Sequence, residues 1–139
     1  MMNSIPLQLI ACAMATALFG ILLNQPPRTI PYTSVIATVG YGLYLLFDRM
    51  PHAYFIAALF IGLSGELLAR VIKKPATLFL TSAVIPLVPG IGLFRSMLFL
   101  SQGEYSSAIR VGTETVLGIF AIALAFTLSS VVFTLTRKN

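Results

Sequence analysis

Hydrophobic positions in this chain form long runs separated by short turns rich in proline and polar residues. The runs are continuous and lack the alternation of polar and apolar positions that marks the strands of a membrane barrel. Continuous apolar runs of this length are typical of helices that cross a lipid bilayer. The pattern predicts five helices, over residues 4–23, 32–47, 53–72, 76–101 and 108–135. The second is the shortest, which leaves open whether it crosses the bilayer completely.

The fourth run is interrupted in its middle. The break contains two prolines and two glycines, namely Pro86, Pro89, Gly90 and Gly92. Because proline has no backbone N–H, the carbonyl groups of Ser82 and Ile85 are expected to lose their helical partners. Lipid offers no replacement, so such a break must face protein or a water-filled cavity. A broken helix at membrane depth indicates a substrate site in a transporter, and the alternative is a simple proline kink.

Composition places the whole chain in a membrane. Of its 139 residues, 58% are hydrophobic and 9% are charged, and the mean hydropathy is +0.94. Soluble domains carry about 25% charged residues, far more than this chain has. We therefore expect a single transmembrane domain over residues 1–139, folded as an all-α helical bundle in the plasma or inner membrane. Cys12, the only cysteine, lies inside an apolar run and is interpreted as a small packing residue.

The distribution of charge predicts the orientation of the chain. With five spans, the nine basic residues divide six to three between the two sides of the membrane. The larger group lies on the side of the C-terminus, and the positive-inside rule makes that side cytoplasmic. The N-terminus is then expected outside. The net charge of +5 does not indicate nucleic-acid binding, because the basic residues lie at helix ends and not on one soluble face.

Charged side chains inside the apolar runs are candidates for function. Glu66 and Arg70 are four residues apart, so they share a helix face and are expected to form an ion pair. Glu66 is the candidate carrier of a coupling proton, and the alternative is an ion pair that only helps to end the helix. No nucleophile–base pair, metal-ligand cluster or phosphate loop stands out, so we predict no catalysis, cofactor or metal.

The second half of the broken run suits an anion. A helix that begins near Gly90 starts with unpaired N–H groups and the positive end of its dipole. Such a start favours a carboxylate, and Arg95 adds a second contact if it turns inwards and not towards the membrane surface. We therefore predict a carboxylate-binding site formed by Pro86, Pro89, Gly90, Gly92 and Arg95.

Several short segments around the break form a recognisable set. They are KPAT at residues 74–77, IPLVPG at 85–90, LFRSM at 93–97, and Gly103 with Tyr105. Together they resemble the membrane segment of the threonine/serine exporter (ThrE) family, over about residues 66–131. The resemblance is closest to the short, separately encoded subunit of members that are split in two.

This resemblance implies export of small amino or carboxylic acids, driven by the proton gradient. Full-length members join a larger N-terminal half to a half like this one, so a larger partner subunit of the same family is implied. Split members also resemble dicarboxylate exporters, so the resemblance does not fix the substrate.

We interpret the chain as the membrane subunit of a secondary exporter that works in the lipid bilayer with a larger partner. Two alternatives remain open, a non-transporting membrane scaffold for a partner protein and a small homo-oligomeric channel. A neighbouring gene for a larger membrane protein with a soluble part would favour the exporter.

The division of basic residues generates a prediction about topology. In a Cys12→Ala background, a cysteine at position 3 should react with a membrane-impermeant thiol reagent from outside the cell. A cysteine at position 139 should react only when the reagent reaches the inside. Reaction of both from one side would contradict the five-span arrangement.

Overall fold

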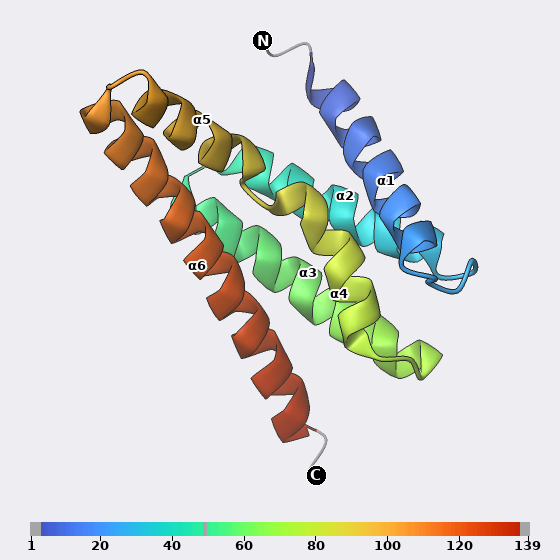
Figure 1. The fold of residues 1–139 in the computed structure, drawn as a ribbon. Coiled ribbons are helices and arrows are strands. Elements are labelled where there is room, and N and C mark those ends of the chain that lie inside the picture. The colour runs from blue at the N-terminus through green and yellow to red at the C-terminus, as the bar shows by residue number, and fades with distance from the viewer. Residues whose placement is uncertain (1–3, 49, 137–139) are drawn as a thin grey trace.

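The computed structural model describes residues 4–48 and 50–136, and within these residues every regular element is helical. The all-α bundle predicted from the sequence is confirmed (Figure 1). In chain order the elements are α1 (Ile5–Leu22), α2 (Ile30–Leu46), α3 (Pro51–Ile72), α4 (Ala76–Val84), the 3-10 turn η2 (Ile85–Leu87), α5 (Gly90–Ser101) and α6 (Tyr105–Thr136).

Prolines mark the starts of three helices, and residues with a left-handed backbone conformation follow their ends. Prolines lie in the first turn of three helices, at Pro6, Pro31 and Pro51. A missing N–H does no harm there, because the first N–H groups of a helix have no intrahelical acceptor. The same three helices are followed by residues with positive φ, namely Asn24 (55°), Asp48 (55°) and Lys73 (58°). Behind α1, the N–H of Gln25 donates to the carbonyl of Gly20 at 2.9 Å, which closes the helix end.

Three of the helices are long and apolar enough to cross a membrane, namely α1, α3 and α6. The pair formed by α4 with η2 and by α5 is bent by 46° and counts as a fourth crossing if it is one broken span. Helix α2 has 17 residues and is shorter than these. The chain is therefore a multi-pass membrane bundle, and a fifth crossing depends on α2.

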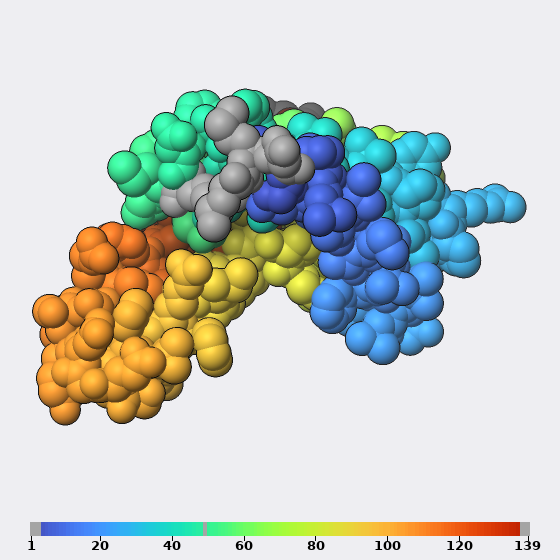
Figure 2. Space-filling view, turned by 90° about the horizontal axis from the view of Figure 1, so that it is seen from above, coloured from blue at the N-terminus to red at the C-terminus, as the bar shows by residue number. Residues whose placement is uncertain are grey.

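Helix α3 lies at the centre of the arrangement and packs against α2, α4 and α6. Helix α1 packs mainly against α2, whereas α5 packs against α6 (Figure 1). Seen from above, one face of the molecule is hollowed between α1, in blue, and the α5–α6 hairpin, in orange (Figure 2). The yellow atoms of the broken segment lie at the deepest part of this hollow. The bend between α4 and α5 therefore shapes the hollow.

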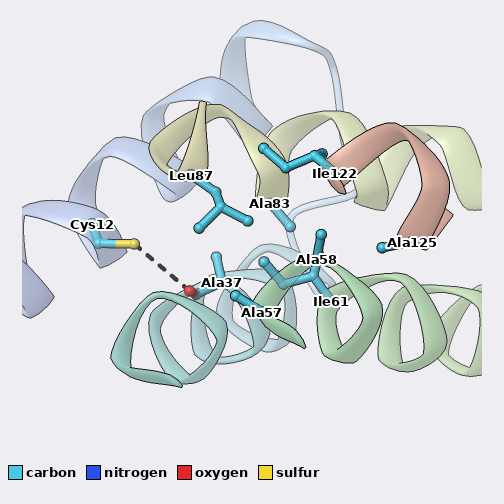
Figure 3. Packing of buried hydrophobic residues seen from close by; sticks show 9 residues of the cluster. All are labelled: Cys12, Ala37, Ala57, Ala58, Ile61, Ala83, Leu87, Ile122 and Ala125. Carbon is cyan, nitrogen blue, oxygen red and sulfur yellow. Dashed lines mark hydrogen bonds between the residues drawn. The ribbon is translucent and has the colours of Figure 1, made fainter. Parts of the chain in front are cut away.

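The buried core is built largely from alanine (Figure 3). Its central cluster consists of Cys12, Ala37, Ala57, Ala58, Ile61, Ala83, Leu87, Ile122 and Ala125. The thiol of Cys12 points at the carbonyl oxygen of Ala37, with Sγ at 3.8 Å from it. Leu87 comes from the 3-10 turn of the break and points into this core. The break is therefore anchored on its inner side by an apolar side chain.

Glycines let the central helices touch. A Cβ added at Gly62 of α3 would lie 2.5 Å from Oγ and 2.9 Å from Cβ of Ser129 on α6. One added at Gly65 would lie 2.7 Å from a methyl group of Leu80 on α4. Small residues of this kind allow the helix backbones to approach closely. Helices in lipid attract one another largely through the van der Waals packing that this approach permits.

The connector between α5 and α6 is shorter than the sequence pattern predicted. The predicted helices left residues 102–107 as the connector, but α6 already begins at Tyr105. Gly103 adopts a φ of +78°, and the N–H of Glu104 donates to the carbonyl of Phe99 at 2.9 Å, which ends α5 within one turn. The carbonyl of Glu104 then accepts from Ala108 at 3.0 Å and starts α6.

The glycine contacts generate a prediction about stability. Alanine at Gly62 should destabilise the protein by about 1–3 kcal/mol through overpacking, because the Cβ of Ser129 cannot rotate away. Thermal unfolding in detergent measures the effect. The matched control is Gly42→Ala, whose added Cβ would meet only Leu9 Cδ2 at an ordinary 3.8 Å. A Gly62→Ala protein as stable as the control would contradict this account of the α3–α6 contact.

Candidate functional site

The break satisfies more of its backbone groups than the sequence predicted. The carbonyl of Ile85 was expected to lose its partner because residue 89 is proline. Instead, it accepts from the N–H of Val88 at 3.3 Å, and the same N–H lies 3.2 Å from the carbonyl of Val84. The segment tightens into a 3-10 turn, in which hydrogen bonds span three residues instead of four. Of the two expected orphan carbonyls, only that of Ser82 remains a candidate acceptor.

The start of α5 is also partly satisfied. Pro89 has φ −77° and ψ 58°, which is the geometry of an inverse γ-turn. In this turn the N–H of Gly90 donates to the carbonyl of Val88 at 2.8 Å, so it is not available to a ligand. The N–H of Leu93 bonds the carbonyl of Pro89 at 3.3 Å. The N–H groups of Ile91 and Gly92 lie between them, where a helix start has no intrahelical acceptor.

The two sides of the break differ in exposure. Leu87 and Pro89 are buried on the inner side, and Pro86 is half-buried. Val88 and Gly90 are exposed on the outer side, and a Cβ added at Gly90 would meet nothing within 4 Å. The outer side therefore has room for a bound group, while the inner side is fixed to the protein core.

Gly92 and Arg95 lie in different environments from each other. A Cβ added at Gly92 would collide with the side chain of Thr115, so this glycine serves the contact between α5 and α6. Arg95 is exposed on α5, one turn after Gly92. The next residue, Ser96, donates from Oγ to the carbonyl of Ala108 at 3.0 Å and fixes α5 against α6. Of the predicted substrate residues, Gly90 and Arg95 are thus open, and Gly92 is engaged in packing.

Two grooves of about 440 Å³ each lie on the described part of the chain. The first runs between α5 and α6 and is lined by residues that include Ser96, Ala108 and Gly112. The second runs between α1 and α2 and is lined by residues that include Leu9 and Gly42. Neither groove is lined by residues 85–92. The space beside the break is instead the open hollow of Figure 2.

The predicted ion pair between Glu66 and Arg70 is not present in the structure. Arg70 donates from its guanidinium to the backbone carbonyl of Phe133 on α6, and its Cζ lies 4.5 Å from the centre of the Phe133 ring. A cation over an aromatic face and a carbonyl acceptor near a helix C-terminus are both favourable for arginine. This contact turns Arg70 away from Glu66, which is half-buried.

Glu66 lies away from the break. The neighbouring Gly65 packs against Leu80 of α4, which places Glu66 level with that residue and not with Pro86. Pro86 lies six positions after Leu80, or about 9 Å further along at the helical rise. The structure therefore does not bring the predicted proton-coupling residue and the predicted substrate residues into one cluster. Within residues 4–48 and 50–136, no group of three or more His, Cys, Asp and Glu could hold a metal ion.

A buried polar network beside the break was not anticipated. Gln25, in the loop between α1 and α2, is 3% exposed and bonds to Thr29, Thr33 and Ser82. Ser82 belongs to α4 and is 57 residues away in the chain. In the sequence Gln25 stands among Asn, Pro and Arg, a setting that equally fits a solvated turn. The spacing of Thr29 and Thr33, one helical turn apart, is the one local signal, and it does not identify the partner.

Comparisons with known proteins assign this membrane bundle to a family. A family model described as threonine/serine exporter, ThrE, matches residues 8–132. An uncharacterized protein of Haemophilus influenzae is 28% identical over 119 residues, which cover 83% of this chain and 40% of that protein. The chain thus spans about two fifths of the length of this relative. No solved structure matches the chain. The extent of the family match establishes that the chain belongs to the threonine/serine exporter (ThrE) family.

Proposed function

We propose that this chain is the membrane component of a proton-driven exporter of small amino or carboxylic acids. The observation that carries the proposal is the family match over residues 8–132, which includes the whole broken segment. Five crossings would place the N-terminus outside and the C-terminus in the cytoplasm, within a single domain of the inner membrane. The break interrupts an apolar run with a 3-10 turn and a bend of 46°, and irregular backbone at membrane depth belongs beside a cavity or another protein.

The carboxylate of the substrate binds at the start of α5. The N–H groups of Ile91 and Gly92 would donate to it, and the exposed Arg95 would supply a charged contact. The open space at Gly90 leaves room for the carboxylate to approach the backbone. A carboxylate is the group that amino acids and dicarboxylic acids share, so this site would serve either substrate class.

A larger partner subunit would enclose the site. The hollow of Figure 2 is open on one side, and α5 has no buried residue within the described chain. Exposed apolar side chains on α5 include Ile91 (72%), Phe94 (67%) and Met97 (69%). Lipid could cover these side chains, but it offers no hydrogen-bond acceptor to the guanidinium of Arg95 or to the N–H groups of Ile91 and Gly92. The greater length of the Haemophilus influenzae relative supports an additional part that supplies this cover.

The first test changes Gly90. Gly90→Val should raise the substrate concentration for half-maximal export about tenfold or stop export, because valine fills the space where the carboxylate approaches. Membrane insertion and folding should be unchanged, since an added Cβ meets nothing within 4 Å. Export is measured in cells or vesicles that also contain the partner subunit. Normal export by Gly90→Val would place the site elsewhere and leave the break as a kink.

Gly92→Ala serves as the contrasting variant. Its added Cβ collides with Thr115, so this substitution should lower thermal stability by separating α5 from α6. Gly90→Val should not do so. Equal loss of stability in both variants would remove the distinction between an open glycine and a packing glycine.

The second test concerns charge at Arg95. Arg95→Ala should weaken substrate binding by about tenfold or more, the expected loss of one charge-assisted hydrogen bond. Arg95→Lys should weaken it less, because the charge remains while the forked geometry is lost. The measurement is the substrate concentration for half-maximal export. Equal behaviour of the wild type and both variants would exclude Arg95 from the site.

The third test concerns proton coupling. Glu66→Gln should abolish export driven by a pH gradient while the protein still folds and assembles, because glutamine cannot release a proton. Counterflow of substrate without a gradient should persist. Wild-type gradient-driven export by Glu66→Gln would leave Glu66 with a structural role only.

Two alternatives stay distinguishable from an exporter. A scaffold would show no change in transport by the partner when Gly90 or Arg95 is altered. A homo-oligomeric channel would conduct without the partner and without any dependence on the proton gradient.

A further inference from the structure

Both the nitrogen and the oxygen of the Gln25 side-chain amide form hydrogen bonds in a buried position. Its Nε2 donates to Oγ1 of Thr29 at 3.1 Å and to Oγ1 of Thr33. Its Oε1 accepts from Oγ of Ser82 at 3.0 Å. All four residues are at most 3% exposed. We call these contacts the Gln25 network, and it joins the α1–α2 loop to α4.

The three hydroxyl groups do not need Gln25 for their own satisfaction. Thr29 Oγ1 donates to the carbonyl of Pro26 at 2.7 Å, and Thr33 Oγ1 donates to the carbonyl of Thr29 at 3.1 Å. Ser82 Oγ also lies 3.2 Å from the carbonyl of Phe79. Each hydroxyl therefore has a backbone acceptor within its own segment. What the amide adds is a connection between two segments that are far apart in the chain.

Both ends of this connection are held in place. The backbone N–H of Gln25 donates to the carbonyl of Gly20 at 2.9 Å. A Cβ at Gly20 would lie 3.0 Å from Gln25 Oε1, so glycine at this position leaves space for the amide. At the other end Ser82 is completely buried. Neither the loop nor α4 can shift without straining or breaking the bond between Oε1 and Ser82.

Ser82 lies at the point where the break begins. It precedes Pro86 by four residues, so its carbonyl is the one that loses an α-helical donor to proline. Helix α4 packs against α1, α2 and α3, whereas α5 packs against α6 and is fixed there by Ser96 and Gly92. The two sides of the break are therefore held by different parts of the bundle. The position of α4 on its side sets where the carbonyl of Ser82 and the turn at residues 85–89 lie.

We propose that Gln25 is a positioning residue for the substrate site: its buried amide fixes the last turn of α4 to the α1–α2 loop. This inference rests on the proposed function, because the site it positions is the one at the start of α5. Gln25 does not touch the substrate and acts through Ser82. The loop between α1 and α2 thereby controls the affinity of a site formed by another part of the chain.

The experiment compares Gln25→Leu with the wild type in the exporter assembled with its partner. Leucine removes the connection but orphans none of the three hydroxyls, so the variant should fold. Hydrogen exchange, read by mass spectrometry, should become at least about threefold faster over residues 82–93 and stay unchanged in the central part of α6. The substrate concentration for half-maximal export should rise about threefold to tenfold, as expected for the loss of one hydrogen bond. The maximal export rate should stay within a factor of two.

Two further variants keep the test decisive. Ser82→Ala breaks the connection from the other end and should reproduce the Gln25→Leu effects, with little additional change in the double variant. The matched control is Thr16→Val, which removes a buried hydroxyl of α1 that bonds locally, to the carbonyl of Cys12 at 2.9 Å. This control should change neither exchange over residues 82–93 nor half-maximal export.

The outcomes separate this inference from the proposed function. Unchanged hydrogen exchange at residues 82–93 in Gln25→Leu would overturn the inference whatever happens to transport. Suppose that Gly90→Val does weaken export. Faster exchange in Gln25→Leu with an unchanged substrate concentration for half-maximal export would then also overturn the inference. Normal export by Gly90→Val would refute the substrate site, and it would overturn the claim that Gln25 sets substrate affinity even if exchange becomes faster.

Discussion

Close approach of helix backbones at small side chains is the constraint on which the rest of this structure depends. Lipid tails are as apolar as the side chains themselves, so burying an apolar side chain between helices gives no hydrophobic gain. Helices in lipid therefore associate through close packing and polar contacts. The core accordingly consists mostly of alanine, and glycine stands at the crossings of α3 with α4 and α6. Most large apolar side chains lie on the outside, as on α5, which has no buried residue.

A second property of lipid, its lack of hydrogen-bonding groups, explains the course of the broken segment. Two prolines remove N–H groups from the helix, and lipid cannot replace the lost bonds. The chain responds with a 3-10 turn at Ile85–Leu87 and an inverse γ-turn at Pro89, which pair most of the exposed groups locally. The resulting bend of 46° separates α5 from the helices that hold α4 and brings it onto α6. The hollow beside the break is a consequence of this separation.

The position and exposure of the broken segment fit the family to which the chain belongs. The chain belongs to the threonine/serine exporter family, and its broken segment lies where one face is hollowed. On the inner side the break is fixed by Leu87 and Pro89, and on the outer side Gly90 and Arg95 are open. A buried inner side with an open outer side suits the substrate site proposed above, which a second protein part would complete. On the α4 side of the break, the buried Gln25 network links Ser82 of α4 to the α1–α2 loop.

The sequence by itself determined the class of the fold and most of its elements. Continuous apolar runs and proline-rich turns predicted α1, α3 and the two halves of the broken run to within a few residues of their ends, because helix formation in lipid depends on local hydrophobicity and on backbone bonding. The ThrE resemblance, carried by the segments around Pro86 and Arg95, was confirmed by the family match. The tertiary structure alone decided which groups meet. Spacing predicted that Arg70 would pair with Glu66, but a carbonyl and a ring on α6 offered arginine a better partner. Gln25 was indistinguishable from a solvated loop residue, because its partner Ser82 is 57 residues away and only packing brings them together.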